Sequence, residues 1–63
     1  MSYRQAREKA GKSVREVMEH MGVTDAAVYF WETGKTAPST DKLLKLAAFY
    51  GCTVDELLRE DSA

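Results

Sequence analysis

Positively charged side chains are concentrated at one end of the chain. Residues 1–15 hold five of them against the single acid Glu8: Arg4, Arg7, Lys9, Lys12 and Arg15. Residues 53–63 reverse this balance, with Arg59 against Asp55, Glu56, Glu60 and Asp61. The net charge of all 63 residues is −1, so the distribution of charge favours a polyanion although its total does not. The pattern indicates phosphate-binding chemistry, with two ordinary solvated helix faces as the alternative interpretation.

The side chains that most often carry catalysis or bind metals are sparse. His20 is the only histidine and Cys52 the only cysteine, so neither a disulfide within the chain nor a metal cluster is expected. His20 falls late in a predicted helix, where a cation suits the helix dipole, and Cys52 fits a buried, unreactive thiol. Asp55 and Glu56 are better explained as first-turn charges of a helix than as an acid–base pair. We therefore predict no enzyme activity, no cofactor and no metal.

Five helices and no strand are predicted to position these groups. They span about 2–10, 13–22, 24–34, 39–50 and 53–58, because apolar residues recur at steps of three and four between capping signals. Ser13 with Glu16 and Thr53 with Glu56 have the spacing of capping boxes. Glycines follow the first four helices, at Gly11, Gly22, Gly34 and Gly51. The expected core residues are Tyr3, Ala6, Ala10, Val17, Met21, Val23, Val28, Trp31, Leu43, Leu44, Leu46, Ala47, Tyr50, Val54, Leu57 and Leu58.

Length and composition limit the class of protein. A chain this short makes one domain, 1–63, of modest stability, in which residues 61–63 are expected to be frayed. A hydrophobic content of 44% and a charged content of 30% are typical of a soluble globular protein. No apolar run approaches the roughly 20 residues of a membrane span, and no signal peptide is expected. The expected compartment is a reducing cytoplasm, with no membrane partner.

Residues 13–34 have the pattern of a helix-turn-helix, two short helices joined by a tight turn at Gly22. In that motif the first helix lies across the nucleic-acid backbone and the second enters the major groove. On a helical wheel of residues 24–33, Thr24, Ala27, Val28 and Trp31 face the core. The opposite arc, about 140° wide, holds Asp25, Ala26, Tyr29, Phe30 and Thr33. The second helix is therefore the predicted recognition helix for double-stranded DNA.

The candidate base-reading residues are Asp25, Ala26, Tyr29 and Phe30. No Arg, Lys, Gln or Asn lies on this arc, so bidentate pairing to guanine or adenine is not expected. Asp25 could accept from a cytosine amino group, Ala26 and Phe30 could pack on thymine methyls, and the Tyr29 hydroxyl could reach a base or a phosphate. We expect weak direct readout, with DNA shape carrying more of the specificity.

The candidate phosphate contacts lie at two helix N-termini and in the loop between residues 35 and 38. Unpaired amides at the start of a helix bind anions, and nearby cations add to them. These candidates are Lys12, Ser13, Val14, Lys35, Thr36, Ser39 and Thr40. Each phosphate neutralised would add about 0.9 to the slope of log affinity against log salt.

Several short motifs together resemble the Xre family of lambda-repressor-like helix-turn-helix domains. They are Gly22–Val23, Trp31–Gly34, Pro38–Ser39, Leu43–Leu44 and Val54–Leu58, and the resemblance covers about residues 3–58. It implies a compact, all-α, five-helix DNA-binding domain. It also implies a transcriptional regulator of repressor type from a phage or mobile element, acting at the nucleoid of a bacterium. A structural ion pair between Arg7 and Glu32 is implied by the same resemblance.

Three residues depart from the family pattern. Val14 stands where relatives carry a glutamine that bonds a phosphate, Met18 where a small residue is usual, and Phe30 where a polar or basic residue is common. These departures weaken the expectation of sequence-specific base reading. The alternative function is a protein-interaction module of the same fold, antitoxin-like or a partner of a larger regulator, binding through the Tyr29 and Phe30 face.

Half-site logic predicts a homodimer on a roughly palindromic operator, because one domain of this size buries too little surface for tight specific binding. Phe49 lies at the edge of the apolar face of the fourth helix, so the region of the fourth and fifth helices is the candidate dimer surface. No second domain for a small-molecule ligand is expected.

Overall fold

Short capping signals delimit the helices. The computed structural model describes residues 2–59, and within that range the chain forms five helices and no strand. They are α1 (Tyr3–Lys9), α2 (Val14–Met21), α3 (Asp25–Thr33), α4 (Thr40–Tyr50) and α5 (Val54–Leu58). The predicted all-α, five-helix fold is confirmed, and the boundaries differ from the predicted ones only at the capping residues. The predicted fraying of residues 61–63 concerns residues outside the described range.

Three helices begin with a capping box. The Ser13 hydroxyl accepts from the Glu16 amide at 3.1 Å, while the Ser13 amide donates to the Glu16 carboxylate at 3.0 Å. Thr53 and Glu56 form the same pair of bonds at the start of α5, as predicted. A third box, Ser2 with Gln5, caps α1. It was not predicted, although the pattern S-x-x-Q in the sequence is a capping-box signal.

Four helices close their C-terminal ends with a similar backbone bond. After α2 and α3, Gly22 and Gly34 take left-handed φ angles of 68° and 84°, which glycine adopts without steric cost. The next amide then donates to the carbonyl five residues back, Val23 to Met18 at 3.1 Å and Lys35 to Phe30 at 2.9 Å. The same bond joins residues 12 and 7 after α1, and residues 52 and 47 after α4.

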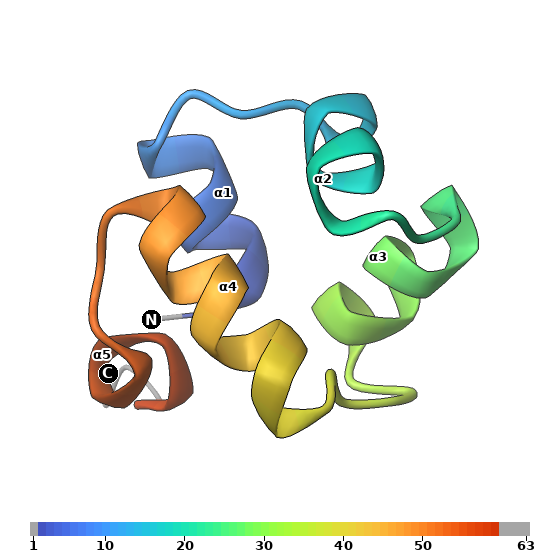
Figure 1. The fold of residues 1–63 in the computed structure, drawn as a ribbon. Helices are drawn as coiled ribbons and strands as arrows, with labels where there is room; N and C mark the ends of the chain where they lie inside the picture. Colours follow the sequence, from blue (N-terminus) through green and yellow to red (C-terminus); the bar gives the residue numbers. More distant parts are fainter. Residues whose placement is uncertain (1, 60–63) are drawn as a thin grey trace.

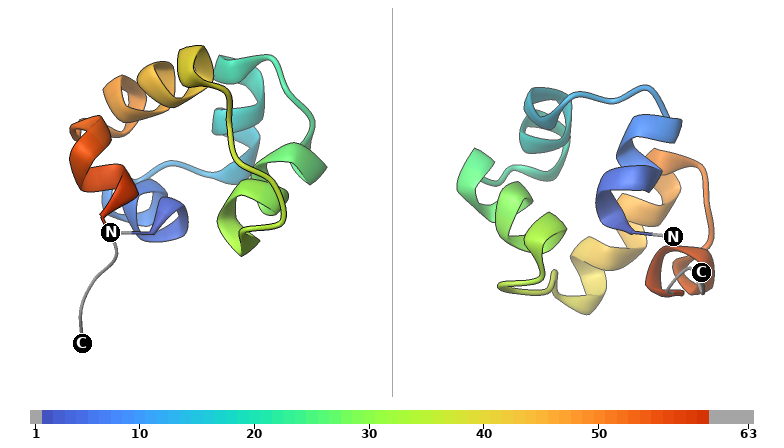
Figure 2. Two further views of the ribbon diagram at one scale, coloured as in Figure 1. Left: turned by 90° about the horizontal axis from the view of Figure 1, so that it is seen from below. Right: turned by 180° about the vertical axis from the view of Figure 1, so that it is seen from behind.

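The five helices surround one core. In Figure 1, α2 and α3 lie side by side at one end and α5 lies at the other, with α1 and α4 between them; the views in Figure 2 keep this order. Each helix contributes to the buried cluster, which consists of Ala6, Val17, Val28, Trp31, Leu46, Ala47, Tyr50 and Leu57. Half-buried apolar residues pack around it, among them Tyr3, Ala10, Met18, Met21, Val23, Leu43 and Val54. The predicted core is thereby confirmed in most positions.

Three residues placed on the core side by the sequence pattern are exposed. Leu44 and Leu58 are 56% and 55% exposed. Leu44 lies about 120° around α4 from its buried face, and Leu58 about 100° around α5 from the buried Leu57. Thr24 is also exposed, because its hydroxyl caps α3 by accepting from the Ala27 amide at 3.2 Å. Helical spacing overestimated the width of the inner faces at these positions.

None of the helices within residues 2–59 has the length and apolar character needed to span a membrane.

Candidate nucleic-acid interface

Helix α3, the predicted recognition helix, turns one face to the core and the opposite face to solvent. Val28 and Trp31 are buried, while all five residues of the predicted outer arc are exposed. Tyr29 is 51% exposed and Phe30 37% exposed, which makes them the largest apolar surfaces of the helix. The predicted orientation of α3 is therefore confirmed, and its outer arc is open to a partner.

Asp25 and Phe30 are less free than the other two candidate base-reading residues, Ala26 and Tyr29. The Asp25 carboxylate accepts from the Ala26 amide at 2.8 Å, so one of its two oxygens is used inside the first turn of α3. The Lys35 ammonium lies 4.6 Å from the centroid of the Phe30 ring. Ala26 and Tyr29 therefore offer the less encumbered surfaces of the four candidate base-reading residues.

The Arg7–Glu32 pair implied by the family resemblance is present. Arg7 Nε donates to Glu32 Oε2 at 2.7 Å and Nη2 to Oε1 at 3.3 Å, with side chains 14% and 7% exposed. The hydrogen bond to Glu32 raises the pKa of Arg7, so the guanidinium stays charged. Arg7 Nη1 also donates to the Lys12 carbonyl at 3.1 Å. One side chain thus joins α1, the turn before α2 and the end of α3, and it fixes the orientation of α3 relative to α1.

At the start of α2, the candidate phosphate contacts take three different roles. The Ser13 hydroxyl is engaged in its capping box, and Val14 is half-buried. Val14 lines a pocket of about 330 Å³ that Arg4, Arg7, Tyr29, Glu32 and Thr33 also line. The Lys12 ammonium lies 4.8 Å from the centroid of the Phe49 ring. Phe49 in turn stacks on His20, with centroids 4.0 Å apart and planes 10° from parallel.

The candidates between α3 and α4 lie on an exposed segment. Lys35, Thr36, Ser39 and Thr40 are all exposed, and the Ser39 hydroxyl accepts from the Lys42 amide at 3.5 Å to cap α4. The amides at the start of this eleven-residue helix add a partial positive charge beside the loop. In Figure 1 this loop follows directly from the end of α3, so a polyanion on α3 would lie close to it.

Both candidate lysines rest on phenylalanine rings, which the sequence reasoning missed. For Lys35 a local signal existed, since the closing bond of a glycine-terminated helix brings together residues five apart. For Lys12 no such signal existed, because Phe49 lies 37 positions along the chain. His20, predicted to lie on the surface, is exposed and also covers Phe49. Cys52 is half-buried rather than buried, and desolvation raises its thiol pKa, which disfavours the reactive thiolate.

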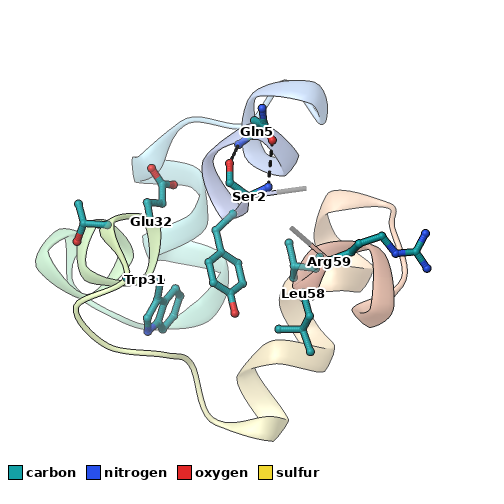
Figure 3. A pocket seen from close by; sticks show the side chains of 10 residues that line it. Ser2, Gln5, Trp31, Glu32, Leu58 and Arg59 are labelled. Carbon is teal, nitrogen blue, oxygen red and sulfur yellow. Dashed lines mark hydrogen bonds between the residues drawn. The ribbon is translucent and has the colours of Figure 1, made fainter. Parts of the chain in front are cut away.

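A larger pocket, of about 460 Å³, lies away from most of the outer arc. Figure 3 shows it between the start of α1, the end of α3 and α5, with Trp31 and Leu58 among its walls. The bonds between Ser2 and Gln5 that cap α1 lie at its edge. Thr33 is the one residue of the outer arc among those that line it. The exposed Leu58 side chain therefore lies in the wall of this pocket.

Two packed helices joined at a glycine turn, the second with an exposed outer face, define a helix-turn-helix domain. A family model described as Helix-turn-helix matches residues 4–57, and the chain belongs to this family, which confirms the Xre-like resemblance. The chain is thus a DNA-binding domain of the transcription-regulation class.

A characterised relative gives the same class. The HTH-type transcriptional regulator ImmR of Bacillus subtilis (strain 168) is 34% identical to the chain over 58 residues. The aligned part is 92% of this chain and 46% of that regulator, so the chain spans about half the length of the relative it matches. No solved structure matches the chain significantly.

Proposed function

We propose that this chain binds double-stranded DNA in a sequence-dependent way by placing α3 in the major groove, as the DNA-binding part of a transcriptional repressor of phage or mobile-element type. The observation that carries the proposal is the exposed outer arc of α3, whose orientation is fixed by the Arg7–Glu32 pair. Membership in the helix-turn-helix family and the likeness to a transcriptional regulator support it.

In the proposed complex, base contacts and phosphate contacts come from different parts of the domain. Asp25, Ala26, Tyr29 and Phe30 face the base edges, where an arc without Arg, Lys, Gln or Asn gives weak direct readout. The sequence-dependent shape of the duplex then supplies much of the specificity. The phosphate contacts are Lys12, Ser13, Val14, Lys35, Thr36, Ser39 and Thr40, with Ser13 and Val14 contributing through the start of α2.

We further propose that the chain acts as a homodimer, which places two copies of α3 on two half-sites. The candidate surface is the region of α4 and α5. Phe49 is half-buried and contacts Lys12 and His20, so the exposed Leu44 and Leu58 are the apolar side chains of α4 and α5 that a second copy could cover.

Fluorescence anisotropy with duplexes of several different sequences at two salt concentrations tests the proposal. Binding that falls steeply with salt is the expected result, because phosphate contacts release counterions. Lys35→Ala should weaken binding to all sequences alike, whereas Tyr29→Ala should change which sequence is preferred. Lys9→Ala is the matched control, since Lys9 lies beside Cys52 and Glu56, away from α3. An equal loss across sequences for both test variants would contradict the assignment of α3.

A protein-interaction module of the same fold is the second candidate function. The exposure of Tyr29, 51%, favours it, because an uncovered aromatic side chain suits a protein partner. Such binding would be far less sensitive to salt than binding to a polyanion. No binding to any duplex at low salt would select this alternative.

A further inference from the structure

Phe30 and Lys35 form a contact whose functional role rests on the proposed DNA binding. Phe30 lies at one border of the outer arc of α3, and Lys35 is the first residue after the glycine that ends the helix. The lysine ammonium lies 4.6 Å from the ring centroid, within the range in which the face of an aromatic ring attracts a cation.

The backbone holds the two residues in this arrangement. The Phe30 carbonyl accepts from the amides of Gly34, Lys35 at 2.9 Å and Thr36 at 3.3 Å. The bond from Lys35 is the closing bond of a Schellman-type helix end, in which the side chains at these two positions commonly make an apolar contact. Here a cation on a ring replaces that apolar contact.

The Lys35 cation is held without being neutralised. Among residues 2–59 the ion pairs involve Arg4, Arg7, Arg15 and Arg59, and no carboxylate pairs with Lys35. A free lysine side chain samples many rotamers and loses that freedom when it binds. A ring that restricts it beforehand lowers this entropic cost, which is the general advantage of preorganisation.

We propose that Phe30 is a positioning residue for a phosphate contact, and not a base reader. Its ring holds the Lys35 ammonium at the border of the reading face, where the ammonium binds a backbone phosphate of the duplex beside the groove. One ring face is thereby occupied by lysine, so base contact falls to Ala26 and Tyr29. Where relatives commonly carry a polar or basic residue, this chain has Phe30, which contributes a charge indirectly by holding the Lys35 ammonium.

A double-mutant cycle on the full chain tests this role. Affinity for several duplexes of different sequence is measured over a salt series for wild type, Phe30→Leu, Lys35→Ala and the double variant. Phe30→Leu keeps an apolar side chain and removes the ring, so binding should weaken about 2- to 5-fold on every sequence. Lys35→Ala should reduce the salt slope by about 0.9. The double variant should bind no more weakly than Lys35→Ala alone. Phe30→Tyr keeps an aromatic ring and should bind as wild type does.

Tyr29→Leu is the matched control, because Tyr29 is the neighbouring aromatic residue on the same arc and no cation of residues 2–59 lies on its ring. Its loss should add to that of Lys35→Ala and should alter sequence preference. Additive losses for Phe30→Leu and Lys35→Ala, or a change of base preference in Phe30→Leu, would overturn the positioning role alone. A wild-type chain that binds no duplex would overturn the proposed function together with it.

A second measurement needs no DNA and does not depend on the stability of a variant. The Lys35 ε-methylene protons lie near the ring face, so their NMR resonances in the free wild-type protein should be shifted upfield. Resonances at the position of a solvated lysine would overturn the proposal.

Discussion

The turns that end α2 and α3 share one backbone geometry and differ in what their side chains do. Both contain a left-handed glycine and the same closing bond, from Val23 to Met18 in the first and from Lys35 to Phe30 in the second. In the first turn both side chains pack half-buried against the core. In the second the pair is exposed, with a cation on a ring. The same local motif therefore closes the core in one place and presents charge in the other.

The two turns are also held to the rest of the domain by different forces. Apolar burial around Val17 and Val28 holds the turn between α2 and α3. Two residues before the second turn, Glu32 joins the buried ion pair with Arg7. Apolar burial tolerates small shifts, whereas a two-bond ion pair fixes an orientation. The first turn therefore needs only to be stable, whereas the ion pair gives the end of α3, just before the second turn, a defined orientation.

Removing the Glu32 carboxylate is expected to have the largest effect on this comparison. Glu32→Ala leaves a nearly buried Arg7 guanidinium without its partner, which should lower the free energy of unfolding by about 3 kcal/mol. Glu32→Gln, which keeps an acceptor oxygen, should lose less. Urea denaturation measures both variants. An unchanged midpoint for Glu32→Ala would mean that apolar packing holds the second turn as well.

Equal substitutions at the two glycines test whether the backbones are equivalent. A Cβ at Gly22 or Gly34 meets nothing within 4 Å, so the cost of alanine is the left-handed conformation alone. Gly22→Ala and Gly34→Ala should each destabilise the domain by about 1 to 2 kcal/mol. Thermal unfolding of the two variants side by side is the measurement. If one variant lost stability within this range and the other well outside it, the two turns would differ in their backbones as well as in their side chains.

The smallest expected effect is on the pH dependence of stability. It comes from a difference between α2 and α3, the helices that lead into the two turns. The capping bonds to Ser13 lower the pKa of Glu16, whereas α3 is capped by Thr24 with Ala27 at the equivalent position. A lowered pKa contributes stability above the ordinary glutamate value of about 4.3 and loses it as the pH falls through the folded-state value.

Glu16→Gln keeps the acceptor oxygen but does not titrate, so the variant should be slightly less stable than wild type at pH 7 and should lose less stability as the pH falls below about 4. Melting temperature as a function of pH reads this out. Glu56→Gln, in the corresponding box of α5, is the control and should behave alike, because its pKa is lowered by the same bonds. A steeper acid limb in either variant would contradict this account.

Local signals predicted most of the fold. The capping pairs and the glycines lie within a few residues of the ends that they determine, so the helix boundaries could be predicted from short stretches of sequence. Trp31 and Val28 fell on one side of a helical wheel and are buried as expected. Leu44 could not be placed in the same way, because its exposure depends on what covers α4, and helical spacing holds no such information.

The exposed outer arc of α3 was predicted from the sequence, whereas most of the side-chain contacts around it were not. The outer arc of α3 follows from spacing, and the Arg7–Glu32 pair came from family resemblance, since nothing local joins residues 25 apart. The stack of His20 on Phe49 and the lysine above it depend on how α2 meets α4. Only the Phe30–Lys35 contact had a signal in the sequence. Lys35 directly follows a glycine and lies five residues after an aromatic residue.

The repeated closing bond has a further consequence, for the speed of folding. Four of the five described helices end with a bond between residues only five apart. Each helix can therefore form and end with groups that diffuse together within a few residues, and little loop-closure entropy opposes it. Chains dominated by such local contacts cross their folding barrier in microseconds to milliseconds. Temperature-jump relaxation should accordingly show this domain refolding within microseconds to milliseconds, about as fast as other small helical domains.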